Sequence, residues 1–274
     1  MSDLVQLASD GDVATLTLNR PERHNSLVPE LLGELLAALE GLRARPELRA
    51  VVLQANGRSF STGGDVRGFY ASADRATYAA ELVGLLNRAI LALIELPMPV
   101  VAAVHGIVTG GSLGLVLGAD IVLAAPGASF TPYYTTVGFS PDGGWATLLP
   151  ALVGRRRAAE ALLLDRPIAA EEAVVWGLAS RLVPAASIRE EALAVAHGIA
   201  GQLPGSVRRA RRLLWGDTAQ IAAALEAERL AFVAQIGEAE AERGMAAFLD
   251  RRRHPGAGEP VPPSPPPMRS SNDA

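Results

Sequence analysis

Near the start of the chain, apolar residues first alternate with polar ones, as in a β-strand, and then recur at helical spacing. Apolar and polar residues alternate over residues 4–8 and 13–19, on either side of a Ser9-Asp10-Gly11-Asp12 turn, which predicts a β-hairpin at a sheet edge. Leucines then recur at helical spacing over residues 28–42, and the β-branched run of residues 49–55 predicts a strand buried on both faces. The sheet therefore starts with an edge hairpin.

Small residues gather after a second strand-like run. Residues 98–104 are apolar, the turn that follows contains Gly110 and Gly111, and residues 113–117 predict the start of a buried helix. A strand, a glycine turn and a helix N-terminus together make an anion site. The turn has neither the Lys-Ser/Thr of a nucleotide P-loop nor the GxGxxG spacing of a dinucleotide site, so both are disfavoured. Glycines that only permit close packing remain the alternative.

A similar glycine turn follows the strand predicted over residues 49–55. The sequence NGRSFSTGGD places Gly63 and Gly64 there, and both free the backbone. Asp65 is predicted to cap a helix over residues 66–70, and this capping role is preferred to a catalytic one. A longer helix is predicted over residues 76–96, where PMP ends it.

Aromatic residues cluster after two further strands, which are predicted at residues 121–124 and 128–131. Tyr133, Tyr134, Phe139 and Trp145 surround the turn SPDGG in a chain that is only 5% aromatic. Burial among aromatic rings would raise the pKa of Asp142 and make it a general base. The alternative is a turn aspartate that bonds its own backbone.

The last part of the chain predicts helices and a tail. The helices are expected over residues 148–164, 169–175, 187–202, 206–214 and 218–250, with an extended return over residues 178–184. The basic run RRARR at residues 208–212 is interpreted as a solvated face. Beyond His254 the chain is rich in proline and poor in large apolar residues, so we expect disorder.

Composition removes much of the catalytic repertoire. The 274 residues carry a net charge of −4, which argues against nucleic acid as a partner. There is no cysteine and no lysine, so thiolate and Schiff-base chemistry are excluded. No two of the four histidines have metal-ligand spacing, and we expect neither a metal site nor a Ser-His triad. Without a signal sequence or an apolar run of membrane-spanning length, the protein is predicted to be cytoplasmic, with no membrane partner.

Residues 3–253 resemble the crotonase, or enoyl-CoA hydratase/isomerase, superfamily, and the motifs are closest to the phenylacetate-pathway type of isomerase. The matching segments are NRPERHNSL, RAVVLQANGRSFSTGGDVRGF, PMPVVAAVHGIVTGGSLGL, GFSPDGGWATLLPALVG, AAEEAVVWGLASRLVP and GMAAFLDRRR. The resemblance implies an α/β fold, a crotonase-like spiral of ββα units over residues 1–200. It also implies a C-terminal helical trimerisation region at residues 201–254, followed by a proline-rich tail at residues 255–274.

The same resemblance implies an acyl-CoA substrate and roles for individual residues. The N–H groups of Gly64 and Gly111 would form an oxyanion hole for a thioester enolate. Thr62 and Val66 would hold the adenine through backbone contacts, and Arg23 would contact a CoA phosphate. The acyl pocket would be walled by Phe69, Tyr133, Tyr134 and Phe139. Coenzyme A enters as part of the substrate, no separate cofactor is expected, and a homotrimer or a dimer of trimers is implied.

Departures from the family pattern narrow the expected reaction. Family hydratases use two glutamates, and the matching positions here hold Gly114 and Tyr134. Asp142 stands where family isomerases and aryl-CoA dehalogenases carry an aspartate. We therefore expect an isomerase that shifts an enoyl-CoA double bond (Δ3/Δ2) or rearranges a ring-derived enoyl or epoxy thioester.

Three alternatives to the isomerase stay open. One is a CoA-thioester hydrolase or dehalogenase with Asp142 as nucleophile, disfavoured because residues 67–75 contain no histidine. The others are a hydratase with atypical residues and a non-catalytic CoA-binding protein.

Overall fold

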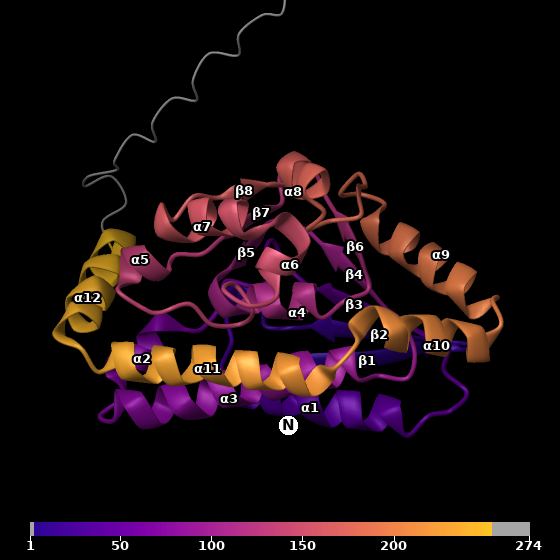
Figure 1. The fold of residues 1–274 in the computed structure, drawn as a ribbon, viewed down its shortest axis with the longest axis horizontal. Helices are drawn as coiled ribbons and strands as arrows, with labels where there is room; N and C mark the ends of the chain where they lie inside the picture. Colours follow the sequence, from indigo (N-terminus) through magenta and orange to yellow (C-terminus); the bar gives the residue numbers. More distant parts are fainter. Residues whose placement is uncertain (1–2, 254–274) are drawn as a thin grey trace, which may run out of the picture.

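A six-stranded sheet forms the centre of the computed structural model, which describes residues 3–253 (Figure 1). Its strands lie in the order β1 (Val5–Asp10), β2 (Val13–Leu18), β3 (Ala50–Ala55), β4 (Val100–Val104), β6 (Ile121–Ala124) and β9 (Arg181–Leu182). The β1–β2 pair is the predicted antiparallel hairpin, and every later pair is parallel. Helices cover both faces, so the central strands are buried, whereas the edge strands β1 and β9 are largely exposed.

Alternate residues of the central strands serve two separate apolar cores. On β3, Val51 and Leu53 pack with helices α1 (Pro29–Arg43) and α3 (Arg75–Ile94). Val52 points to the opposite face, where helix α9 (Ile188–Ala200) packs. Because both faces of β3 are buried, its sequence is a nearly continuous apolar run, as predicted.

Strand–strand–helix units repeat along the chain. After β4 comes β5 (Ile107–Thr109) and then α4 (Leu113–Leu117), and after β6 comes β7 (Ser129–Thr131) and then α5 (Tyr134–Val137). The second strands pair with each other, and β8 (Ile168–Ala169) extends them into a three-stranded sheet. The sequence prediction missed β5 and β8, which are too short to show a periodicity.

Two predicted long helices are each broken in two. The helix expected over residues 148–164 is divided at Gly154, which has a φ of +85°, into α6 (Leu149–Val153) and α7 (Arg155–Leu163). The helix expected over residues 218–250 ends at Ile236 as α11 (Thr218–Ile236), and α12 (Ala239–Arg253) follows. Gly237 is the C-cap of α11. The break lets α11 lie along α3 while α12 turns toward α2 and α5 (Figure 1).

The remaining described helices connect these parts. They are η1 (Pro21–Arg23), α2 (Val66–Ala71), η2 (Gly110–Ser112), α8 (Ala170–Trp176) and α10 (Pro204–Trp215). Helix α3 is long and apolar enough to cross a membrane by length and composition, but half of its apolar stretch is buried inside the protein. Packing against α1 and α11 identifies it as a core helix. The tail predicted at residues 255–274 lies outside the described residues.

The interpretation of RRARR as a solvated face was wrong for Arg211. This residue is 6% exposed, and its Nε donates to Asp120 Oδ2 at 2.7 Å. Its terminal nitrogens donate to the carbonyl oxygens of Leu93, Ile94 and Leu96 at the end of α3. Carbonyl oxygens at a helix C-terminus lack N–H donors from a following turn, so a buried guanidinium can bind several of them together with one carboxylate.

Candidate active site

Two glycine-rich turns, distant in the sequence, lie against each other. Val108 of β5 pairs with Ser61 in a parallel bridge, and the Thr109 N–H donates to the Ser61 carbonyl oxygen at 3.1 Å. Gly63 has a φ of +71°, and a Cβ on it would lie 3.2 Å from the carbonyl carbon of Thr109. Only glycine therefore fits where the two turns touch.

Each turn contains one glycine, Gly64 or Gly111, whose backbone N–H group is not used to hold the turn together. Leu27 bridges to Gly64 through the carbonyl and N–H groups of that glycine's two neighbours, so the Gly64 N–H points away from Leu27. Gly111 lies in the first turn of η2, where N–H groups have no acceptor within the helix. Both glycines line one cavity with about 810 Å³ of empty space. Two donors can therefore face the same ligand oxygen.

Asp142 lies in this cavity and is 6% exposed. The Tyr134 hydroxyl donates to Asp142 Oδ1 at 2.6 Å and also lies 2.9 Å from the Asp142 carbonyl oxygen. A Cβ placed on Gly111 would lie 2.7 Å from Asp142 Oδ2, so the carboxyl group abuts this glycine. Because Tyr134 engages Oδ1, Oδ2 is the oxygen left to exchange a proton with a ligand.

The surroundings of Asp142 give it an unusual proton affinity. Burial raises the pKa of its carboxyl group from 3.8 to about 7, the Tyr134 hydrogen bond opposes this rise, and the Glu228 carboxylate adds to it. Burial and the Asp142 charge also raise the pKa of Tyr134 well above 10, so its hydroxyl keeps its proton and remains a donor. A carboxyl group with a pKa near 7 can both take up and return a proton at neutral pH.

Gly114, one turn beyond Gly111, has no space for a side chain. A Cβ there would collide with the Ile90 side chain of α3 and would lie 2.6 Å from the carbonyl oxygen of Gly143. A glutamate at this position would require α3 or the Asp142 turn to move. Position 114 therefore lacks a carboxylate and also lacks the space for one.

Aromatic rings wall the cavity from several elements. Phe69 of α2, Phe139 and Phe232 of α11 have ring centroids 5.1–5.6 Å apart. Tyr133 is 43% exposed, and its ring centroid lies 6.2 Å from that of Phe248 on α12. The cavity is thus apolar except near Asp142 and the glycine turns. The sequence prediction missed Phe232 and Phe248, because their helical spacing resembles that of ordinary core residues.

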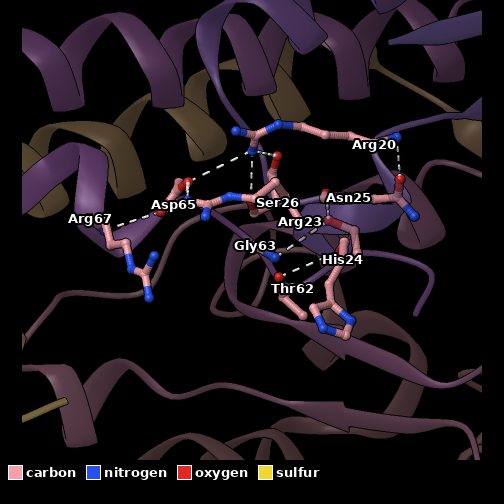
Figure 2. A network of polar contacts seen from close by, with 10 residues as sticks. Arg20, Arg23, His24, Asn25, Ser26, Thr62, Gly63, Asp65 and Arg67 are labelled. Carbon is pink, nitrogen blue, oxygen red and sulfur yellow. Dashed lines mark hydrogen bonds and ion pairs between the residues drawn. The ribbon is translucent and has the colours of Figure 1, made fainter. Parts of the chain in front are cut away.

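A second, polar cavity adjoins the first and shares Thr62, Gly64 and Val66 with it. Asp65 caps α2 as predicted, since its Oδ1 accepts the Arg67 N–H at 3.1 Å. Its Oδ2 accepts Arg23 Nη2 at 3.1 Å, and Figure 2 shows Asp65 linked to Arg20, Arg23 and Arg67. The Arg23 side chain is 39% exposed, so its guanidinium is held in place and still reaches solvent.

All the site residues predicted from the sequence line these two cavities. The first is lined by Thr62, Gly64, Val66, Phe69, Gly111, Tyr133, Tyr134, Phe139 and Asp142, and the second by Arg23. Their chemical roles stay predictions. The sequence analysis did not single out Glu228, because Glu226, Glu228 and Arg229 together look like the charged face of a surface helix.

Asp142 is expected to make folding stability depend on pH. The unfolded carboxyl group has a pKa of 3.8 and the folded one of about 7, so the folded state binds more protons between these values. The free energy of unfolding should therefore fall as pH rises from 4 to 7, by on the order of 4 kcal/mol from this group. In Asp142→Asn this contribution disappears, so the variant should gain stability over wild type as pH rises.

Urea unfolding of both proteins at pH 5 and pH 8 measures this effect. Comparison of the two proteins cancels the contributions of titrating groups that do not interact with Asp142. A stability difference between variant and wild type that is the same at both pH values would contradict the expectation.

Comparisons with known proteins agree with one another. Residues 8–256 match the family model described as enoyl-CoA hydratase/isomerase. A Mycobacterium tuberculosis protein named "Probable enoyl-CoA hydratase EchA12" is 36% identical over 250 residues, which is 88% of each chain. The 1,2-epoxyphenylacetyl-CoA isomerase of Escherichia coli is 31% identical over 245 residues, 88% of this chain and 93% of that protein. A crystal structure of an enoyl-CoA hydratase/isomerase from Pseudoalteromonas atlantica is similar with a TM-score of 0.81 and 32% identity, covering 91% of this chain and 98% of that one.

Proposed function

We propose that this chain, which belongs to the enoyl-CoA hydratase/isomerase family, is an acyl-CoA isomerase. It would move an enoyl-CoA double bond between C3 and C2, or rearrange a ring-derived enoyl or epoxy thioester. The predicted membership of the crotonase superfamily and the predicted α/β fold are confirmed. The observation that carries the isomerase proposal is a single buried carboxyl group, Asp142, beside two glycine N–H donors.

The proposed cycle needs one acid/base group. Asp142 Oδ2 takes a proton from C2 of a 3-enoyl thioester, the C2–H bond breaks, and the negative charge moves onto the thioester oxygen. The N–H groups of Gly64 and Gly111 stabilise this enolate oxygen. The protonated Asp142 then returns its proton to C4, and the double bond comes to lie between C2 and C3. Atoms and charge balance with no other reactant.

The residues that replace the hydratase glutamates support isomerisation rather than hydration. Hydration needs a group that activates water and a group that delivers a proton to the α carbon. Gly114 has no side chain and no room for one. The Tyr134 hydroxyl donates its hydrogen bond to Asp142. The aromatic wall around the cavity also disfavours an activated water molecule.

Incubation of the purified protein with a 3-enoyl-CoA tests the proposal. Conjugation with the thioester carbonyl should increase the ultraviolet absorbance, and a panel that includes ring-derived enoyl and epoxy thioesters would narrow the substrate. Hydration of a 2-enoyl-CoA without isomerisation would overturn the proposal in favour of a hydratase. A covalent Asp142 adduct detected by mass spectrometry would instead indicate a hydrolase or dehalogenase.

The polar cavity is proposed to hold the CoA phosphates, with Arg23 as a ligand. Arg23→Gln should raise the Kd for CoA about 10-fold, since a charge-assisted hydrogen bond is lost and Asp65 is left without this partner. Isothermal titration with CoA measures the effect. Arg45→Gln, which removes an exposed arginine paired with Glu47, is the matched control. Equal Kd values for wild type and Arg23→Gln would remove Arg23 from the binding site.

We also propose that the chain assembles as a homotrimer or a dimer of trimers. Leu213 and Leu214 on α10 are 83% and 84% exposed, and Leu203, just before this helix, is 78% exposed. Adjacent exposed leucines such as Leu213 and Leu214 support an interaction surface at this end of α10. Sedimentation equilibrium of the purified protein measures the oligomeric state, and a monomer would contradict the proposed assembly. The cytoplasmic location stays a prediction.

A further inference from the structure

A second carboxyl group, that of Glu228, is buried behind the catalytic cavity. Glu228 lies on α11 and is 6% exposed. Its Oε2 accepts the Gly144 N–H at 2.7 Å, and its Oε1 accepts the Ala146 N–H at 2.9 Å. Both oxygens are thus acceptors, as in an ionised carboxylate. Within residues 3–250, no arginine or histidine forms an ion pair with it.

The two N–H groups bound by Glu228 belong to the turn that carries Asp142. Gly143 in this turn packs directly on Gly111, since a Cβ on Gly143 would lie 2.6 Å from the Gly111 Cα. Trp145, one residue beyond Gly144, donates from its indole nitrogen to the Gly110 carbonyl oxygen at 2.8 Å. The turn is therefore fastened to the second glycine turn on one side and to α11 on the other.

We propose that Glu228 is a positioning residue that fixes the Asp142 turn against Gly110 and Gly111 and brings a second buried carboxylate to that turn. Its catalytic meaning rests on the proposed isomerase function. The role assigned to Glu228 goes beyond the site residues predicted from the sequence. It gives α11 a polar role at the active site in addition to the apolar wall that Phe232 provides, although Glu228 itself does not line the cavity.

The charges around Asp142 agree with this role. Tyr134 of α5 faces it as a neutral donor, Glu228 of α11 as an anion, and Gly111 and Leu86 contribute no charge. Burial raises the pKa of Glu228 as well, and the N–H groups of Gly144 and Ala146 oppose that rise. Arg229, the next residue along α11, is paired with Glu226. No ion pair within residues 3–250 therefore neutralises Glu228.

An isomerase benefits from this arrangement because its base must also act as an acid. The Tyr134 hydrogen bond by itself favours the ionised form of Asp142, which would take a proton weakly and return it readily. The negative charge of Glu228 acts in the opposite direction. Asp142 can then hold the substrate proton long enough to deliver it to C4.

The test is to titrate Asp142 in wild type and in Glu228→Gln. Carboxyl-¹³C NMR of protein labelled at aspartate follows the titration, and Asp142→Asn assigns the signal. Glu228→Gln should move the midpoint to lower pH by about 1 pH unit, because a nearby negative charge is removed. Glu238→Gln removes an exposed charge that has no ion pair within residues 3–250, just beyond the same helix, and should leave the midpoint unchanged. An unchanged midpoint in folded Glu228→Gln would overturn the electrostatic role.

Glu228→Asp separates position from charge and covers the case in which Glu228→Gln does not fold. It keeps the charge but withdraws it from the Gly144 and Ala146 N–H groups. The Asp142 midpoint should stay raised while kcat falls at least 10-fold, and a wild-type kcat would overturn the positioning role. The titration does not depend on turnover, so a protein without isomerase activity would refute the proposed function and leave this result intact.

Discussion

Asp142→Asn is expected to lower kcat for double-bond isomerisation by about 10²–10⁴-fold, the usual contribution of a general acid–base residue. Asparagine can still accept the Tyr134 hydrogen bond at Oδ1, so the shape of the cavity should be retained. What is lost is the group that takes the proton from C2 and returns it to C4. The Kd for the acyl-CoA substrate should stay within a few-fold of wild type.

Stopped-flow absorbance with a 3-enoyl-CoA gives kcat, and isothermal titration with a saturated acyl-CoA gives the Kd. Asp217→Asn is the matched control, because Asp217 caps α11 far along the chain and asparagine caps helices equally well. If Asp142→Asn kept activity within 10-fold of wild type, another group would have to be the base.

The wild-type pH profile should reflect the same residue. Because burial raises the pKa of Asp142 to about 7, kcat/KM should increase with pH up to about 7 and then level off, as the basic form of the free enzyme accumulates. A profile that levels off near pH 4 instead would mean that Asp142 is not the base.

Gly111→Ala is expected to lower kcat by about 10²–10³-fold, as when an oxyanion-hole donor is removed. The added methyl group would lie 2.7 Å from Asp142 Oδ2 and 2.7 Å from the Leu86 Cδ2 atom. Either the carboxyl group or the glycine turn must therefore shift, which separates the base from the N–H donor. Overpacking of this kind should also lower the free energy of unfolding by about 1–3 kcal/mol.

The stability loss and the catalytic loss can be measured separately. Urea unfolding gives the first, and single-turnover kinetics at saturating enzyme gives the second. Gly41→Ala is the control, because a Cβ at this position in α1 has no atom within 4 Å. It should leave kcat unchanged and raise stability by about 1 kcal/mol. A Gly111→Ala variant with wild-type kcat would exclude Gly111 from the oxyanion hole.

The first hairpin, the buried strand β3 and the cap of α2 could be predicted from the sequence, because each depends on residues close together in the chain. Alternation around Gly11 predicted the first hairpin, and the unbroken apolar run of β3 predicted burial on both faces. Asp65 was predicted as an N-cap from its place between a glycine turn and a helix, and its side chain accepts the Arg67 N–H. The motif resemblance added expected roles for Gly64, Gly111 and Asp142, which line one cavity.

The sequence by itself thus determined the order of the long elements, the two glycine turns and most of the site residues. Only the tertiary structure decided which polar side chains are buried and what they face. Glu228 and Arg211 sit in charged helical stretches that look solvated, yet each is 6% exposed and satisfies backbone groups from a distant segment. The sequence also does not show that the Ile90 side chain fills the space beside Gly114. Burial depends on partners brought together by packing, and no periodicity along one segment contains that information.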